Sequence, residues 1–172
     1  FGPKRSDAFS YELGGELTKI NPALQALLID SDIAVQLNRV NVAHSHTWYA
    51  NLAGYLASKI FGIPHVVTAH SLEPLRPWKA EQLGGGYQIS SWVEKLAYEN
   101  ANAIIAVSEG MKKDVLSAYP NIDASRVHVI LNGINTTRFA PNVDIAPVEK
   151  YGVKGPFALF VGRITRQKGL AH

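Results

Sequence analysis

Short apolar runs alternate with segments of helical periodicity along this chain, and that alternation constrains its fold more than any other feature. Runs of strand length lie at 42–46, 63–69, 103–107, 126–131 and 156–161. Segments with helical spacing of apolar residues lie at 23–40, 48–61, 87–100 and 109–119. Strands that alternate with helices of this length need crossover connections, which make neighbouring strands parallel. The sequence therefore predicts an α/β fold with a doubly wound parallel sheet.

Several residues mark where these elements begin and end. Asn21 and Pro22 suit the start of the first helix, Gly62 follows the second, and Ser108 suits the N-cap of the last. Ser91 and Glu94 have the spacing of a capping box within the third, although Ile89 and Trp92 indicate an earlier start for that helix. Asn132-Gly133 predicts a turn, and a long loop is expected over 71–86, where ordered loops of such length are often functional.

Composition excludes several classes of chemistry. The 172 residues contain no Cys, which excludes disulfides, thiolate metal sites and cysteine nucleophiles and is compatible with a reducing compartment. No apolar run approaches the roughly 18 residues of a membrane span. We therefore expect a cytoplasmic protein that does not use the membrane as a partner.

The positive charge of the chain is concentrated near its end. Lys and Arg number 17 against 14 Asp and Glu, a surplus of +3. After Ala140 there are five basic residues (Lys150, Lys154, Arg163, Arg166 and Lys168) against Asp144 and Glu149, so this segment accounts for the whole surplus. A small, local excess predicts a site for a small anion rather than a nucleic-acid-binding face.

Ligands of open α/β sheets bind beyond the carboxyl ends of the strands. His44 and His46 lie at such an end with their side chains on one face, because strand side chains alternate. One interpretation is a metal site of the kind that hydrolases use; the other, which we favour, is one packed His and one that meets a ligand, since further metal ligands are lacking.

His70 directly follows the next apolar run and leads into the long loop. Glu73, Arg76, Trp78 and Lys79 follow it, a mixture of carboxylate, cations and an aromatic ring that suits sugar hydroxyls and the apolar faces of sugar rings. A solvated charged loop is the alternative, and the spacing alone does not decide between them.

The segment 160–169 predicts the anion site more specifically. Gly162 ends a strand, and Arg163, Arg166 and Lys168 precede an expected helix N-terminus. Cations beside free backbone N–H groups bind phosphate oxygens, so a diphosphate is the expected ligand, with a basic surface turn as the alternative.

Four segments, in order, carry a family resemblance: HSHTWYANLAG (44–54), VVTAHSLEPLRPWKAEQLGGGYQISSWVEKLAYENANAIIAVS (66–108), VHVILNGINTTRF (127–139) and FVGRITRQKGL (160–170). Together they resemble the retaining GT-B glycosyltransferases of family 4, in particular the actinobacterial-type glycogen synthases, a branch that includes α-maltose-1-phosphate synthases. The loop at 72–87 is the most discriminating segment.

The resemblance implies an enzyme with two Rossmann-like domains that transfers glucose from a nucleotide-sugar donor, commonly ADP-glucose, to an α-1,4-glucan or glucose 1-phosphate. It implies that Arg163 and Lys168 hold the donor diphosphate, so that no metal cofactor is needed. His70 matches the active-site His of the family. His46, Trp48, Glu73 and Arg76 are expected on the acceptor side.

The resemblance also implies a division of the chain. Residues 1–140 are expected to form an incomplete N-terminal acceptor domain, and 141–172 a linker with the first strand and phosphate loop of the donor domain. Family members have a glycine-rich loop before the first of these segments and paired glutamates after the last, so we expect a fragment that is inactive alone. Two departures are noted: Thr47 stands where better-known synthases have Asp, and Asn135 where Asp is common.

Three alternatives remain at this point. The protein is another family 4 hexosyltransferase, a metal-dependent hydrolase built on His44 and His46, or a fragment that binds glucan without catalysis. Homo-oligomerisation is left open, and no nucleic-acid partner is expected.

Overall fold

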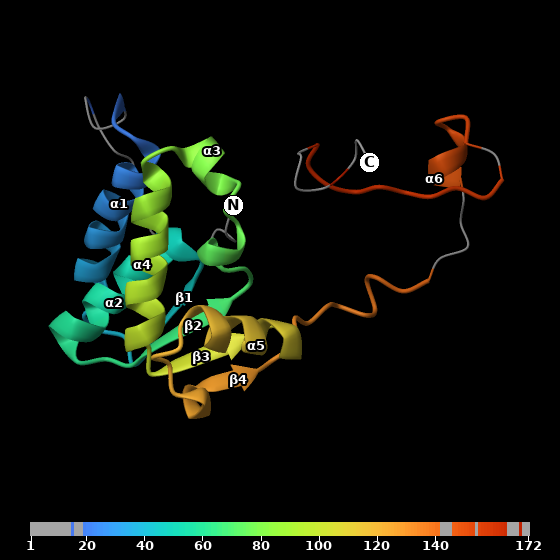
Figure 1. Cartoon of the computed structure of the whole chain (residues 1–172). Coiled ribbons are helices and arrows are strands. Elements are labelled where there is room, and N and C mark those ends of the chain that lie inside the picture. The colour runs from blue at the N-terminus through green and yellow to red at the C-terminus, as the bar shows by residue number, and fades with distance from the viewer. Residues whose placement is uncertain (1–14, 16–18, 142–145, 154, 165–168, 170–172) are drawn as a thin grey trace. The chain divides into compact units, whose positions relative to one another are not determined.

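The computed structural model describes residues 15, 19–141, 146–153, 155–164 and 169 of the chain (Figure 1). The backbone divides into two compact units, Phe1–Asn132 and Gly133–His172, and each is described by itself. Along the described residues, none of the helices combines the length and apolarity needed to cross a bilayer.

A four-stranded parallel sheet forms the centre of the first unit. It consists of β1 (Ala43–His46), β2 (His65–Ala69), β3 (Ala103–Ala106) and β4 (Val127–Val129), side by side in that order. Each lies within a run predicted to be a strand, so the α/β, Rossmann-like prediction is confirmed. The observed strands are shorter than those runs, because pairing with a neighbour, rather than apolar character alone, sets strand length.

Helices precede and connect the strands at the predicted positions. They are α1 (Pro22–Gln36), α2 (Trp48–Phe61), α4 (Gly86–Asn100) and α5 (Glu109–Ala118). The Asn21 side chain accepts the backbone N–H of Ala23, and Ser108 Oγ accepts that of Met111 at 3.0 Å. Gly62 ends α2 with a φ of 68°, the left-handed conformation that glycine adopts without strain. These three boundary predictions are confirmed.

The capping box predicted from Ser91 and Glu94 is wrong. Helix α4 begins at Gly86, so both residues lie inside it. The Glu94 carboxylate instead accepts a hydrogen bond from another segment, through the backbone N–H of Glu73. Spacing of Ser and Glu alone does not fix a helix start when the residues before them also form helix.

Part of the loop predicted at 71–86 is helical. It contains the 3₁₀ turn η2 (Glu73–Leu75) and the short helix α3 (Lys79–Leu83). Pro74 occupies the first turn of η2, where its missing N–H costs nothing, and Lys-Ala-Glu-Gln-Leu are all good helix formers. The two elements give this connection a fixed shape.

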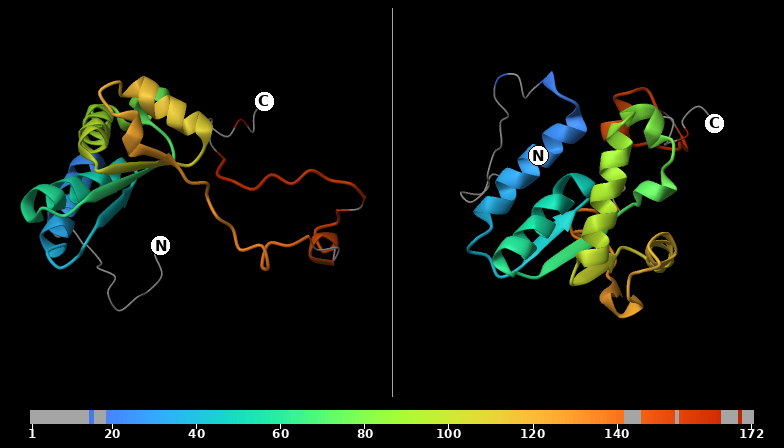
Figure 2. Two further views of the ribbon diagram at one scale, coloured as in Figure 1. Left: turned by 90° about the horizontal axis from the view of Figure 1, so that it is seen from below. Right: turned by 60° about the vertical axis from the view of Figure 1, so that its left-hand side comes forward.

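The core lies on one face of the sheet. Val67, Ile104, Ala106 and Val127 are buried there with residues of α4 and α5, among them Ala97, Tyr98 and Val115. Strand order runs in one direction, so right-handed crossovers place the connecting helices on the same face. The left view of Figure 2 shows α4 and α5 on one side of the strands.

The opposite face of the sheet is more open. His44 and His46 of β1 and His128 of β4 are exposed there, and Val66 and Ile105 are half-buried. In the register of the sheet His46 stands opposite Thr68, so polar groups of β1 and β2 meet on this face.

The second unit contains the short helix α6 (Ala146–Glu149) and extended chain. The strand predicted at 156–161 does not form: residues 157–161 have no regular secondary structure, and Leu159 and Val161 are 76% and 84% exposed. Their apolar pattern needs a neighbouring strand, and none of the described strands pairs with them. The turn predicted at Asn132-Gly133 lies instead at residues 136–139, where Asn135 Oδ1 accepts the N–H of Arg138 at 2.9 Å.

Candidate active site at the carboxyl ends of β1 and β2

Three histidines from two neighbouring strand ends lie in a row. His44 and His46 come from β1, with ring centroids 4.5 Å apart, and His70 follows β2, with its ring stacked 5.2 Å from that of His46. His44 Nε2 lies 2.7 Å from Thr68 Oγ1, and His46 Nδ1 lies 2.9 Å from His70 Nε2. The structure thus brings His46 and His70, both predicted as site residues, into contact.

The contact between His46 and His70 restricts their protonation. A hydrogen bond between two ring nitrogens needs a proton on one and a lone pair on the other, so one of the two rings is neutral. Desolvation, and then the neighbouring His44 and His70, lower the pKa of His46. His70 remains exposed, with Nδ1 as the ring nitrogen for a ligand.

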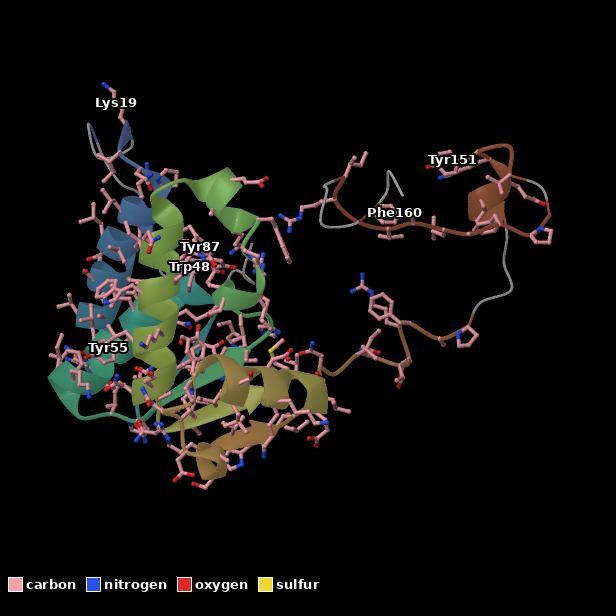
Figure 3. All side chains as sticks on the ribbon, viewed as in Figure 1. Lys19, Trp48, Tyr55, Tyr87, Tyr151 and Phe160 are labelled. Carbon is pink, nitrogen blue, oxygen red and sulfur yellow. The ribbon has the colours of Figure 1, made fainter. Side chains whose placement is uncertain are left out.

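Thr47 joins β1 to α2 in a strained conformation. Its φ is 66°, in the left-handed region that a β-branched residue rarely adopts, and its hydroxyl donates to the carbonyl of His46. One residue thereby turns the chain from strand to helix. The half-buried Trp48, labelled in Figure 3, follows at the start of α2. Its ring meets that of Tyr49 edge-on.

A groove of about 320 Å³ lies beside β1 and opens next to the histidines. Side chains of α1, β1 and α2 line it, chiefly Ile33, Leu37, Val42, His44, His46 and Ala50. Imidazoles at its edge and apolar groups along its wall suit a ligand that has both hydroxyls and C–H faces.

The segment after His70 turns Glu73 inward and leaves Arg76 partly exposed. Glu73 is 1% exposed; its Oε1 accepts from Lys79 Nζ at 2.5 Å and its Oε2 from Ser90 Oγ at 2.8 Å. Arg76 donates from Nη1 to Ser71 Oγ at 2.8 Å and lies 3.8 Å from Glu73 Oε1. The Arg76 guanidinium is thereby tied to Ser71, the residue that directly follows His70.

The structure describes one of the two predicted diphosphate ligands. Arg163 is an exposed residue of the second unit. Lys168, like Arg166, lies outside the described residues.

The structure offers no support for the metal-dependent alternative. Among the residues that the structure describes, no group of three or more His, Asp or Glu side chains is arranged to hold a metal ion. Nitrogens of the three rings are instead engaged with one another and with Thr68.

Sequence reasoning missed the buried carboxylate of Glu94. It is 2% exposed, and its Oε1 accepts from Glu73 N at 2.7 Å and from Tyr119 Oη at 2.5 Å. Burial raises its pKa to about 7, which the two hydrogen bonds offset only in part. A signal was present: Glu94 falls on the buried stripe of α4 with Ser90, Val93 and Ala97, where an acid needs partners.

Comparison with known proteins identifies the family. The model of glycosyltransferase family 4 matches residues 12–138. The chain is 53% identical to an α-maltose-1-phosphate synthase of Mycolicibacterium smegmatis and 51% identical to one of Mycobacterium tuberculosis, in each case over 99% of this chain and 46% of the relative. It is 29% identical to a D-inositol 3-phosphate glycosyltransferase of Mycobacteroides abscessus, over 72% of this chain and 28% of that protein.

The chain thus spans less than half the length of these curated relatives. The family match covers the whole described sheet, the three histidines and the segment that holds Arg76. The chain belongs to glycosyltransferase family 4.

Proposed function

We propose that the protein transfers glucose, with retention of the α-configuration, from ADP-glucose to glucose 1-phosphate, which yields α-maltose 1-phosphate and ADP. The observation that carries this proposal is the identity of 51–53% to two α-maltose-1-phosphate synthases over 99% of the chain. An α-1,4-glucan is the alternative acceptor, as expected for glycogen synthesis, and another hexosyl transfer of family 4 is the broader alternative. We keep the cytoplasmic location as a prediction.

His70 is proposed to hold the transferred sugar. An exposed imidazole at a strand end, with Nδ1 not engaged by His46, is able to donate to or accept from a sugar hydroxyl. The hydrogen bond with His46 restricts the orientation of the His70 ring. A fixed hydrogen bond contributes most to rate where it is formed in the transition state.

Arg76, His46 and Trp48 are proposed to meet the acceptor. The guanidinium of Arg76 is the group in this set that suits a sugar phosphate, because its fork matches phosphate oxygens. Trp48, half-buried at the start of α2, offers an apolar ring face. Glu73 acts here through Arg76 and Lys79, since its carboxylate is bonded to protein groups.

Arg163 and Lys168 are proposed to hold the donor diphosphate, in a donor domain that begins within residues 141–172. Departure of ADP builds negative charge on phosphate oxygens, and fixed cations stabilise that charge most in the transition state. Residues 1–140 would then belong to the acceptor domain.

The proposal is tested with the complete protein, ADP-glucose and glucose 1-phosphate. We expect release of ADP and formation of a disaccharide phosphate whose new linkage is α, seen in the proton NMR spectrum of its anomeric region. Parallel reactions replace the acceptor by maltohexaose or free glucose, and the donor by UDP-glucose. Transfer to maltohexaose but not to glucose 1-phosphate would favour the glucan alternative; no nucleotide release from either donor would refute glucosyl transfer.

A further inference from the structure

We propose that Glu94 is a positioning residue for the acceptor: from inside α4 it holds the segment 71–79, which directly follows His70, and with it Arg76. This inference rests on the proposed function, because it assigns Arg76 to the acceptor. Among the described residues, the Glu94 carboxylate accepts hydrogen bonds from the Glu73 N–H and the Tyr119 hydroxyl. It acts through the protein groups that it binds.

Glu94 joins two elements that are distant in sequence. One carboxylate oxygen, Oε1, accepts from the backbone N–H of Glu73 in η2 and from the hydroxyl of Tyr119 at the end of α5. The carboxylate is 2% exposed and Tyr119 3% exposed, so water does not compete for these bonds. Removal of a buried acceptor leaves the Glu73 N–H and the Tyr119 O–H without partners.

Two further residues of α4 hold the same turn. Ser90 Oγ donates to Glu73 Oε2 at 2.8 Å, and Tyr87 Oη donates to the Glu73 carbonyl at 2.9 Å. Tyr87, Ser90 and Glu94 are three and four residues apart and therefore share one face of the helix. Glu73 is thus bound through its N–H, its carbonyl and its side chain, all from this face of α4.

The position of Arg76 depends on that turn. The guanidinium reaches Ser71 Oγ at 2.8 Å and approaches Glu73 Oε1 to 3.8 Å, while its Nε is buried and makes no hydrogen bond with the described residues. Ser71 and Glu73 therefore fix its direction. A displacement of η2 would move both, so an acceptor held by Arg76 would bind less well although donor contacts are unchanged.

The test compares steady-state kinetics of Glu94→Ala, Glu94→Gln and Tyr119→Phe in the complete enzyme. For Glu94→Ala we expect the KM for glucose 1-phosphate to rise by about tenfold or more, with the KM for ADP-glucose within about twofold of wild type. Glu94→Gln retains an amide oxygen in the place of Oε1 and should restore most of the loss. Tyr119→Phe, which removes one of the two donors, should be intermediate.

A purely structural role predicts a different pattern. It would lower the active fraction, and hence kcat, without separating the two KM values. Glu99→Ala is the matched control, because Glu99 lies on the same helix and its carboxylate accepts from the surface residue Asn121. It should leave both KM values unchanged.

The outcomes separate the two proposals. An inactive wild-type enzyme refutes the proposed function and this inference with it. An active wild-type enzyme whose acceptor KM is unchanged in Glu94→Ala overturns the inference alone. If Glu94→Ala fails to fold, Tyr119→Phe decides: an increase in acceptor KM alone supports positioning, and unchanged or jointly changed KM values contradict it.

Discussion

Three ionisable side chains in the core have pKa values displaced towards their neutral forms. Burial raises the pKa of Asp30 and of Glu94 to about 7 and, with His44, lowers that of His65 to about 4. Each side chain is 2% exposed or less. At neutral pH the core therefore holds a neutral imidazole and two carboxyl groups close to their midpoints.

Asp30 gives the clearest test of this displacement. Neither of its carboxylate oxygens makes a hydrogen bond of good geometry with the described residues, and nearby backbone amides of Leu52 and Ala53 offset burial only in part. Because the folded-state pKa lies above the unfolded value of 3.8, the contribution of Asp30 to stability is full below pH 3.8 and is lost as pH rises to 7.

Asp30→Asn should therefore gain stability relative to wild type as pH rises. Between pH 4 and 8 the difference in free energy of unfolding should shift in favour of the variant by at most about 4 kcal/mol, the equivalent of three pKa units. Urea denaturation at several pH values measures this. Asp32→Asn, at an exposed position on the same helix, is the control. The prediction would be contradicted if the difference in free energy of unfolding from wild type changed as little with pH for Asp30→Asn as for Asp32→Asn.

At the scale of elements, α2 packs closely against β1 and β2 because Gly54 has no side chain. Ser45 Oγ lies 2.7 Å from His65 Nε2 and donates to Asn51 Oδ1 at 2.9 Å, which links β1, β2 and α2 in the core. Gly54 of α2 covers the His65 ring: a Cβ at this position would lie 2.2 Å from Nε2. The close approach requires glycine for its lack of a side chain, not for its φ.

Gly54→Ala should be destabilising for this reason. His65 is buried and cannot move away without breaking its bond to Ser45, so we expect a loss of about 1–3 kcal/mol in the free energy of unfolding. Thermal and urea denaturation measure it. Gly85→Ala is the matched control, since a Cβ there meets nothing within 4 Å and its φ is −58°; a similar loss in both variants would exclude the clash as the cause.

The elements also show what sequence could predict. Helix α2 was predicted with its observed bounds, because apolar periodicity and Gly62 are local signals. The strand predicted at 156–161 does not form, because a strand also needs a neighbouring strand, which its own residues do not specify. Likewise the strand-end rule brought His46 and His70 together, whereas the bonds from Glu94 to η2 and Tyr119 arise from tertiary packing and were missed.

At the scale of the whole molecule, the proposal assigns donor and acceptor to different units of the chain. The residues proposed to meet the acceptor lie in the first unit, and those proposed to hold the donor diphosphate lie in the second. A variant in either of these two sets should then mainly affect the kinetics of one substrate. This is the expected behaviour of an enzyme that binds its two substrates on separate domains.

Arg163→Ala and Lys168→Ala should each lower kcat/KM for ADP-glucose in the complete enzyme. If each cation stabilises the leaving diphosphate, the cost is about 2–4 kcal/mol of transition-state stabilisation. Rates of ADP release measure it. Lys150→Ala removes an exposed cation of the same unit and should have little effect; unchanged turnover in both site variants would remove Arg163 and Lys168 from the donor site.

The contact between His46 and His70 also limits the positive charge that these two rings can carry together. Two rings that share one N–H···N bond carry at most one positive charge between them. A second proton can enter only if the rings separate. The arrangement of the two rings is thus tied to the number of protons that they carry between them.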